Sequence, residues 1–296
     1  MYKGVKGSSL KADILLVFIS LIWGSTFIVT KKTIETIPPI TFNSVRFIIA
    51  SILLLVIFLY RPKKINRVVV LDGFVLGVVL FLTFTFQTMG LKFVTASETG
   101  FITGLYLIFV PIISVVFLKK SMDIKTVIAV FMAFTGLFLI SFHGNKIGFG
   151  MGEFLVLLNA LFVAFHIVLI DYYCKRDDVF ALTSIQIFVL TILSVCYALL
   201  FEDWKGKIVF SGANVFAFFL TGVMATVVAF LIQTYAQKFT TPTKAAVIFT
   251  LEPLSAAFFG FLIGGEILTR DQYVGAFLIF LSMLIIEIKF KRSKGD

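Results

Sequence analysis

A glutamate lies inside an apolar stretch of the chain, where an ionisable side chain is costly. Residues 238–266 read KFTTPTKAAVIFTLEPLSAAFFGFLIGGE, and Glu252 stands near their middle, directly before Pro253. Because a helix rises about 1.5 Å per residue, Glu252 would lie roughly 12 Å beyond Lys244. Two interpretations stay open. Glu252 binds a proton or a cationic group of a ligand, or it is the fixed partner of a buried donor such as Arg46 or Lys244.

Other polar side chains in apolar segments could line a cavity together with Glu252. Arg46 could bind a carboxylate, although its long side chain could also reach the polar edge of its own segment. Thr99, Thr103 and Tyr106 recur at i, i+4 and i+7 and therefore share one helix face. Such hydroxyls line a pore, or they hydrogen-bond to their own helix or to a neighbouring one, and both alternatives stay open.

Two further pairs of polar residues have a spacing or a setting that favours a shared surface. Asn159 and His166 are seven residues apart, so one helix face carries both. His166 is a candidate proton relay or an interhelical hydrogen-bond partner. Gln87 and Gln233 each end an apolar segment beside a Lys-Phe-Thr link, and they are candidates for a cavity wall or for a structural tie.

Aromatic, small and acidic residues near segment ends complete the set of candidates. Trp23 could close a cavity or simply pack, whereas Gly24 with Ser25 allows two helices to approach closely. Glu266 ends the 238–266 stretch. Its position favours a role in capping a helix or pairing with a loop.

These side chains must be positioned by helices that cross a lipid bilayer. The chain has 296 residues, of which 59% are hydrophobic and 14% charged, and its mean hydropathy is +1.06. A soluble domain of this length could not hide so much apolar surface, and the segments are too long for the strands of a membrane barrel. We predict an all-α integral membrane protein with ten transmembrane helices, at residues 13–30, 40–60, 69–89, 95–118, 124–142, 152–172, 180–201, 213–235, 243–265 and 273–288.

The distribution of basic residues predicts the orientation of these spans. The net charge is +10, and most of the 26 lysines and arginines fall in the links on the side of the amino terminus, with Arg46 inside a span. Basic links favour the cytoplasmic side of a membrane. We therefore expect a multi-pass protein of a bacterial-type cytoplasmic membrane with both termini in the cytoplasm.

An internal repeat relates the two halves of the chain, residues 1–146 and 147–296. GLKFVTAS at 90–97 matches AQKFTTPT at 236–243 with an offset of 146, which also aligns Gln87 with Gln233. Nearer the start of each half the offset is 140, which aligns Arg46 with Gln186 and makes Gln186 a candidate site residue. Because each half holds five spans, an odd number, the two repeats are expected to be inverted in the membrane.

Inverted repeats build a binding site at the membrane midplane, and interrupted spans mark its position. The fourth span holds Gly100, Gly104 and Pro111, and the ninth holds Pro253 and Gly260. Pro253 lacks a backbone N–H and frees a carbonyl one turn upstream, near Phe249. Pro253 and Pro111 are therefore candidate hinges, although the repeat aligns Pro253 with Leu107 rather than with Pro111.

Several motifs resemble the drug/metabolite transporter superfamily, in its ten-span branch built from two EamA repeats. They are WGSTF at 23–27, Pro39 followed by Asn43, Arg46 and Phe47, FQTMGLKFVTASETGFITGLYLIFVP at 86–111, and LEPLSAAFFGFLIGGE at 251–266 followed by Gly275. The resemblance covers essentially the whole chain. It implies a ten-helix carrier that exports small metabolites or amino acids.

Other classes of function lack the residues that they require. The sequence holds no phosphate-binding G-x-x-x-x-G-K-[ST], no dinucleotide-binding glycine pattern and no H-E-x-x-H, so we expect neither catalytic residues nor a cofactor nor a metal. The basic residues form no stripe with interleaved aromatics, so nucleic acid is not an expected partner. The expected partners are a small-molecule substrate, which a proton could accompany, and the lipid bilayer, and the oligomeric state stays open.

Two alternatives to a carrier remain at the level of the sequence. A channel would share the same spans, but it would conduct without saturation and without stimulation by solute on the far side. An integral membrane enzyme acting on lipid would need clustered His, Asp or Ser groups, whereas the only two histidines, His143 and His166, fall in different segments.

Overall fold

The chain folds into a bundle of long helices whose two halves repeat the same order of elements. The computed structural model describes residues 6–60, 65–118, 124–140, 142–143, 146–147 and 149–287. The first half holds α1 (Lys6–Thr33), α2 (Pro39–Tyr60), α3 (Arg67–Gly90), α4 (Ala96–Thr103), α5 (Tyr106–Leu118) and α6 (Ile124–Ile140), followed by the two-residue strands β1 (Phe142–His143) and β2 (Lys146–Ile147). The second holds α7 (Met151–Tyr173), α8 (Val179–Phe201), α9 (Gly212–Phe218), the π-helical segment η1 (Phe219–Val228), α10 (Ala229–Gln237), α11 (Pro242–Ile248), α12 (Leu251–Gly264) and α13 (Arg270–Glu287).

Eight described segments are long and apolar enough to cross a membrane, so the chain is a multi-pass membrane protein. They are Leu10–Thr33, Pro39–Tyr60, Arg67–Gly90, Ala96–Ile113, Met151–Tyr173, Val179–Phe201, Gly212–Gln237 and Lys244–Gly264. These segments match the first four spans expected in each half. The expected fifth and tenth spans fall on α6 and α13, described over 17 and 18 residues, and ten spans remain a prediction.

Side chains at the helix starts satisfy the first backbone N–H groups, which have no partner within the helix. Asn66 accepts from Val69 N at the start of α3, and Asp178 accepts from Phe180 N and Ala181 N at the start of α8. At the start of α4, Thr95 and Glu98 form a reciprocal capping box. These caps fix where each span begins.

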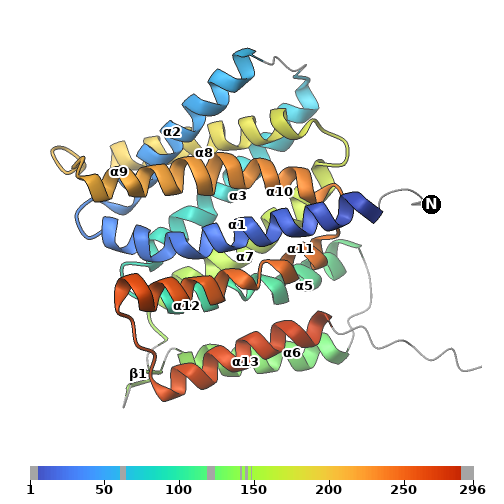
Figure 1. Cartoon of the computed structure of the whole chain (residues 1–296), viewed down its shortest axis with the longest axis vertical. Coiled ribbons are helices and arrows are strands. Elements are labelled where there is room, and N and C mark those ends of the chain that lie inside the picture. Colours follow the sequence, from blue (N-terminus) through green and yellow to red (C-terminus); the bar gives the residue numbers. More distant parts are fainter. Residues whose placement is uncertain are drawn as a thin grey trace, which may run out of the picture.

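Equivalent spans of the two halves pack on each other, and in the broken fourth and ninth spans the first helix of one packs on the second helix of the other. Helix α2 packs against α8, and α4 packs against α12. Helix α6 packs against α13, and these two helices lie side by side at one edge of the bundle (Figure 1). The first helix of each half inserts into the other half, since α1 packs on α10 and α12 while α7 packs on α3, α4 and α5. The halves are therefore interlocked around an approximate two-fold axis.

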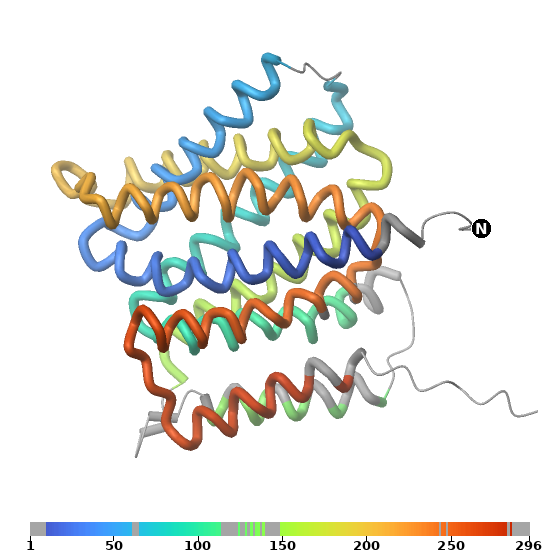
Figure 2. The backbone as a smooth tube through the Cα atoms, in the orientation of Figure 1, coloured from blue at the N-terminus to red at the C-terminus, as the bar shows by residue number. Residues whose placement is uncertain are grey.

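The links of the chain gather at two opposite ends of the bundle (Figure 2). The links α7–α8 and α10–α11 lie at the end where α1 begins, and the links α1–α2, α3–α4, α8–α9 and α12–α13 lie at the other end. Helices α1 and α7 consequently run in opposite directions. This is the arrangement that an inverted repeat requires.

The fourth and ninth expected spans are each broken into two helices. The first break is at Gly104–Leu105, between α4 and α5, and the second is at Phe249–Thr250, between α11 and α12. With the offset of 146, the two breaks coincide to within one residue. The halves thus bend at equivalent depths, even though Pro111 and Pro253 do not align: Pro111 lies inside α5, whereas Pro253 is the third residue of α12.

Glycines bring two helix pairs close together where the halves meet. A Cβ added at Gly24 would collide with Ser255 and with the Glu252 carbonyl, so α1 and α12 are in backbone contact there. A Cβ at Gly100 would collide with the side chain of Ala256, which places α4 against α12. The close approach expected at Gly24 is confirmed.

Candidate functional site

A cavity lies where the two halves meet. It has a volume of about 540 Å³, which includes its opening to solvent. Helices α1, α3, α4, α5, α7, α10 and α12 and the break before α12 contribute its wall, lined by Trp23, Thr26, Phe27, Leu80, Thr83, Phe84, Gln87, Thr103, Tyr106, Val163, Ile167, Phe230, Gln233, Phe249 and Glu252.

Most of the wall consists of residues that the internal repeat makes equivalent. An offset of 140 pairs Trp23 with Val163 and Phe27 with Ile167, and an offset of 146 pairs Phe84 with Phe230, Gln87 with Gln233, Thr103 with Phe249 and Tyr106 with Glu252. Both members of all six pairs line the cavity. The cavity therefore lies on the approximate two-fold axis, and each half supplies the same positions to it.

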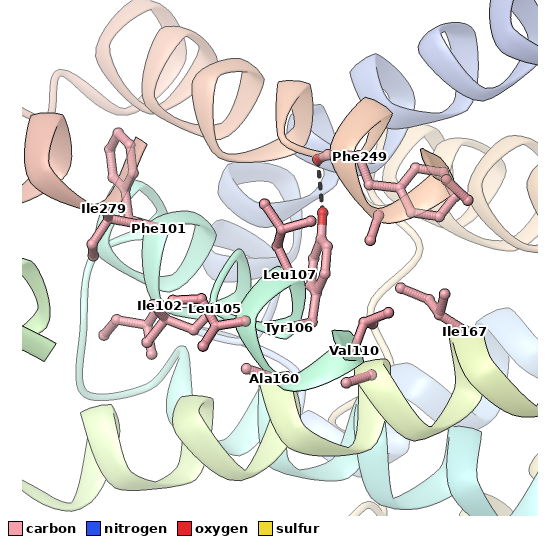
Figure 3. Close-up of a cluster of buried hydrophobic side chains, with 14 of the residues drawn as sticks. Phe101, Ile102, Leu105, Tyr106, Leu107, Val110, Ala160, Ile167, Phe249 and Ile279 are labelled. Carbon is pink, nitrogen blue, oxygen red and sulfur yellow. Dashed lines mark hydrogen bonds between the residues drawn. The ribbon is translucent and has the colours of Figure 1, made fainter. Parts of the chain in front are cut away.

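Glu252 and Tyr106 meet at this axis. The Tyr106 hydroxyl donates to the Phe249 carbonyl at 2.7 Å (Figure 3). The same hydroxyl lies 3.5 Å from Glu252 Oε2. Pro253 cannot donate to the Phe249 carbonyl, one turn upstream, so that oxygen is available to the tyrosine. The Phe249 carbonyl also accepts from the Glu252 N–H at 2.9 Å, so it loses its partner at Pro253 but is not free as expected. The bond from Tyr106 ties α5 to the break before α12.

The second interpretation of Glu252, a fixed ion pair with Arg46 or Lys244, is not seen in the part of the chain that the structure describes. Lys244 Nζ lies 2.7 Å from Asp13 Oδ2. The guanidinium carbon of Arg46 lies 4.4 Å from the ring centroids of both Phe47 and Phe84. Arg46 is buried behind Phe84, and its Nε and Nη2 have no hydrogen-bond partner among described residues.

The aromatic side of the cavity is a continuous set of ring contacts. The Trp23 ring centroid lies 5.6 Å from that of Phe230 and 5.3 Å from that of Phe249. Phe84 and Phe230 meet edge to face at 6.1 Å. The Trp23 indole N–H donates to the Ala225 carbonyl at 2.9 Å, which holds this ring in place.

Amides and hydroxyls form the polar side of the wall. Thr103 donates from Oγ1 to Asn159 Oδ1 at 2.8 Å, and Asn159 Nδ2 donates to the Thr83 carbonyl at 3.0 Å. Asn159 thus lies behind the wall and orients Thr103. Gln87 and Gln233 line the cavity from α3 and α10, and Gln233 Oε1 has no partner among the described residues.

The remaining predicted site residues lie outside the cavity wall. His166 Nε2 and Gln186 Oε1 are 3.0 Å apart, and the His166 ring packs edge to face on Phe230 from behind. Ser25 donates to the Ile22 carbonyl, and Thr99 donates to the Thr95 carbonyl. Both hydroxyls therefore bond back to their own segments. For Thr99, this is the structural alternative that was considered for the face shared by Thr99, Thr103 and Tyr106.

Prediction from the sequence missed several wall residues. Phe84 and Phe230 could not be singled out among 37 phenylalanines, although their equivalence under the offset of 146 would have found them. Thr26 is the equivalent of His166, and Thr83 lies one turn before Gln87. Among the described residues, no group of three His, Cys, Asp or Glu side chains could hold a metal ion.

Comparisons with known proteins agree with this arrangement. The EamA-like transporter family model matches residues 10–142 and 150–288. An uncharacterized transporter of Archaeoglobus fulgidus is 37% identical over 97% of this chain and 88% of its own length. The uncharacterized inner membrane transporter YedA of Escherichia coli is 23% identical over 90% of this chain and 88% of its own length. A crystal structure with 16% identity superposes with a TM-score of 0.69, covering 93% of this chain and 96% of the other. The chain belongs to the EamA-like transporter family.

Proposed function

We propose that the protein is a secondary carrier that exports small metabolites across the cytoplasmic membrane by alternating access. The observation that carries the proposal is the cavity whose wall comes from equivalent positions of two inverted halves. Exchanging the conformations of two such halves interchanges the face to which a shared site opens. The excess of basic residues in the links on the side of the amino terminus supports a cytoplasmic location for both termini.

Glu252 is the proposed coupling residue, and the two helix breaks are the proposed points of bending. A carboxylate on the wall of a central cavity can exchange a proton or a cation as its access changes from one face to the other. Pro253 has no N–H to donate to the Phe249 carbonyl, which accepts instead from Tyr106 and from the Glu252 N–H, so the helical hydrogen-bond pattern is interrupted at the α11–α12 break. Pro111, inside α5, keeps its proposed hinge role in the first half.

Counterflow into liposomes tests the proposal. Purified protein is reconstituted in vesicles that each hold one unlabelled solute from a panel of amino acids, amines, carboxylates and nucleosides. We expect at least one internal solute to accelerate uptake of its labelled form, with a rate that saturates. Uptake that rises in proportion to concentration, with no acceleration by internal solute, would instead identify a channel.

A further inference from the structure

Charge is distributed very unevenly over the cavity wall. Of the residues that line it, Glu252 is the one carboxylic acid, and no lysine or arginine lines it. Arg46 lies behind Phe84, and Lys244 is engaged with Asp13. A ligand with a negative group would therefore meet a carboxylate and no counter-charge.

Glu252 has no cationic partner among the described residues. It lies in the first turn of α12, where the positive end of the helix dipole stabilises a carboxylate. Among the described residues its carboxylate has one hydrogen bond, the long one from Tyr106 at 3.5 Å, and it has no ion pair. Its remaining hydrogen-bonding capacity faces the cavity that it lines.

Aromatic rings line the same cavity as the carboxylate and offer surfaces that also attract cations. Phe249 precedes Glu252 by one turn, and Trp23 packs on Phe249 with ring centroids 5.3 Å apart. Phe230 and Phe84 extend the same wall. The faces of such rings carry negative potential, and tryptophan gives the strongest attraction to an ammonium group. The rings also offer an apolar surface to the body of a ligand.

We propose that the substrates are organic monocations, in which an ammonium group binds Glu252 and a compact apolar or aromatic body packs on Trp23, Phe230 and Phe249. This inference rests on the proposed carrier function and narrows its substrate class. An amine fits the wall better than the amino acid with the same side chain, because the wall offers the extra carboxylate no positive partner.

Three probes with a common phenyl ring test the charge requirement on the wild-type protein. Phenethylamine is a cation, phenylalanine a zwitterion and phenylpropionate an anion at neutral pH. Binding to the purified full chain in detergent is measured by calorimetry, and counterflow of each probe is measured in liposomes. We expect phenethylamine to bind about tenfold or more tightly than phenylalanine, and phenylpropionate to bind least, since charge-assisted hydrogen bonds are the strong ones.

The variant Glu252→Gln should lose about tenfold or more of phenethylamine affinity. Glu35→Gln, which changes an exposed glutamate in the α1–α2 link, is the matched control and should bind like the wild type. If phenylalanine or phenylpropionate bound more tightly than phenethylamine, the cation class would be overturned. The same holds if phenethylamine did not bind while another solute showed counterflow. Either result would leave the proposed carrier function standing. Absence of counterflow for every solute of the wider panel would count against the carrier function itself.

Discussion

Glu252 differs from the buried carboxylates Glu98 and Asp72 in its lack of strong donors. Glu98 accepts from Thr95 N and from Gln272, and Asp72 accepts from Arg176 Nε at 3.0 Å. Each of these groups is fixed by bonds that a structural role requires. Glu252 instead lines a cavity and accepts one long bond from Tyr106. At the scale of single residues, it is the carboxyl group that the cavity leaves accessible to a ligand or a proton.

Replacing Glu252 by Gln tests its proposed role in coupling. The amide keeps the shape of the side chain but neither carries charge nor takes up a proton in the physiological range. We expect the rate of counterflow to fall about tenfold or more and its dependence on pH to disappear. Initial rates are measured over a series of pH values, beside Glu35→Gln. A variant with the wild-type rate and pH profile would exclude Glu252 from the mechanism.

A second residue, Asp177, should make the stability of the folded protein depend on pH. It lies in the α7–α8 link, at the end of the bundle where α1 begins. Burial, together with the nearby Asp72 carboxylate, raises the pKa of Asp177 from its ordinary 3.8 to about 6, although Arg176 and Lys238 oppose the shift. The folded state thus binds this proton more tightly than the unfolded chain. The resulting stabilisation is fully present below pH 3.8 and is lost as the pH rises through about 6.

Asp177→Asn should remove this dependence. We expect the melting temperature of the wild type in detergent to fall between about pH 4 and pH 6.5, and that of the variant to change less over the same window. The comparison uses the full chain, and Asp271→Asn, an exposed acid in the first turn of α13, is the control. Parallel melting curves for wild type and Asp177→Asn would contradict the expectation.

Among single residues, the sequence could identify those whose chemistry is unusual for their surroundings. An acid inside an apolar stretch identified Glu252, and recurrence in both halves identified Gln87 and Gln233, and all three line the cavity. Thr26 and Phe84 were missed because threonine and phenylalanine are ordinary residues of apolar helices. Arg46 was expected at the site, yet its stacking on Phe47 and Phe84 depends on the packing of α2 and α3, which one sequence does not reveal.

At the scale of elements, two helix starts are held by carboxylates from the other half of the chain. Glu266, after α12, accepts from Ala96 N at 2.7 Å and Ser97 N at 2.9 Å at the start of α4. Glu202, after α8, accepts from Ile40 N at 2.9 Å and Thr41 N at 2.6 Å at the start of α2. The capping role expected for Glu266 is confirmed, whereas the helix it caps could not be foreseen.

Glu266→Gln and Glu202→Gln should destabilise the protein by similar amounts. In each case the amide turns an N–H group toward backbone N–H donors, so one of the two N-terminal hydrogen bonds is lost. We expect a cost of about 1–2 kcal/mol for each variant, measured by thermal unfolding in detergent. Glu35→Gln should leave the melting temperature unchanged. An unchanged melting temperature in either capping variant would show that the corresponding carboxylate contributes little.

The broken spans show which features of an element a sequence can predict. The glycines and prolines of the fourth and ninth spans identified both as interrupted. The position of the break along each span could not be predicted from the prolines, because Pro111 lies within α5 and the break comes before it. The position follows instead from tertiary contacts, namely the Tyr106 hydroxyl on the Phe249 carbonyl and the packing of α4 on α12.

At the scale of the whole molecule, the two ends of the bundle differ in the charges that face each other. At the end where α1 begins, Asp13 of α1 and Lys244 of α11 are 2.7 Å apart, which joins the first half to the second. The equivalents of these residues at the opposite end are Glu153 and Glu98, by offsets of 140 and 146. Two acids cannot form the same bond, so the repeat is symmetric in shape but not in its closing contacts.

This asymmetry predicts that the Asp13–Lys244 pair biases the carrier toward closure at the end where α1 begins. A part-exposed ion pair contributes about 0.2–1 kcal/mol, so Lys244→Met should shift the open-to-closed ratio at that end by a factor of about 1.4 to 5. The shift can be measured in a chain in which Ser replaces Cys174 and Cys196. Gln233→Cys then reports access from the end where α1 begins, and Gln87→Cys reports access from the opposite end.

With Lys244→Met, an impermeant thiol reagent should label Gln233→Cys faster and Gln87→Cys more slowly, because alternating access couples the two faces in opposite senses. Exchanging the charges, Asp13→Lys with Lys244→Asp, rebuilds the attraction with reversed polarity and should restore both rates toward the wild type. Mere loosening of the fold would raise both rates together, and an inert surface contact would leave both unchanged. Only a reciprocal change that the exchange reverses fits two halves whose closed ends alternate around the shared cavity.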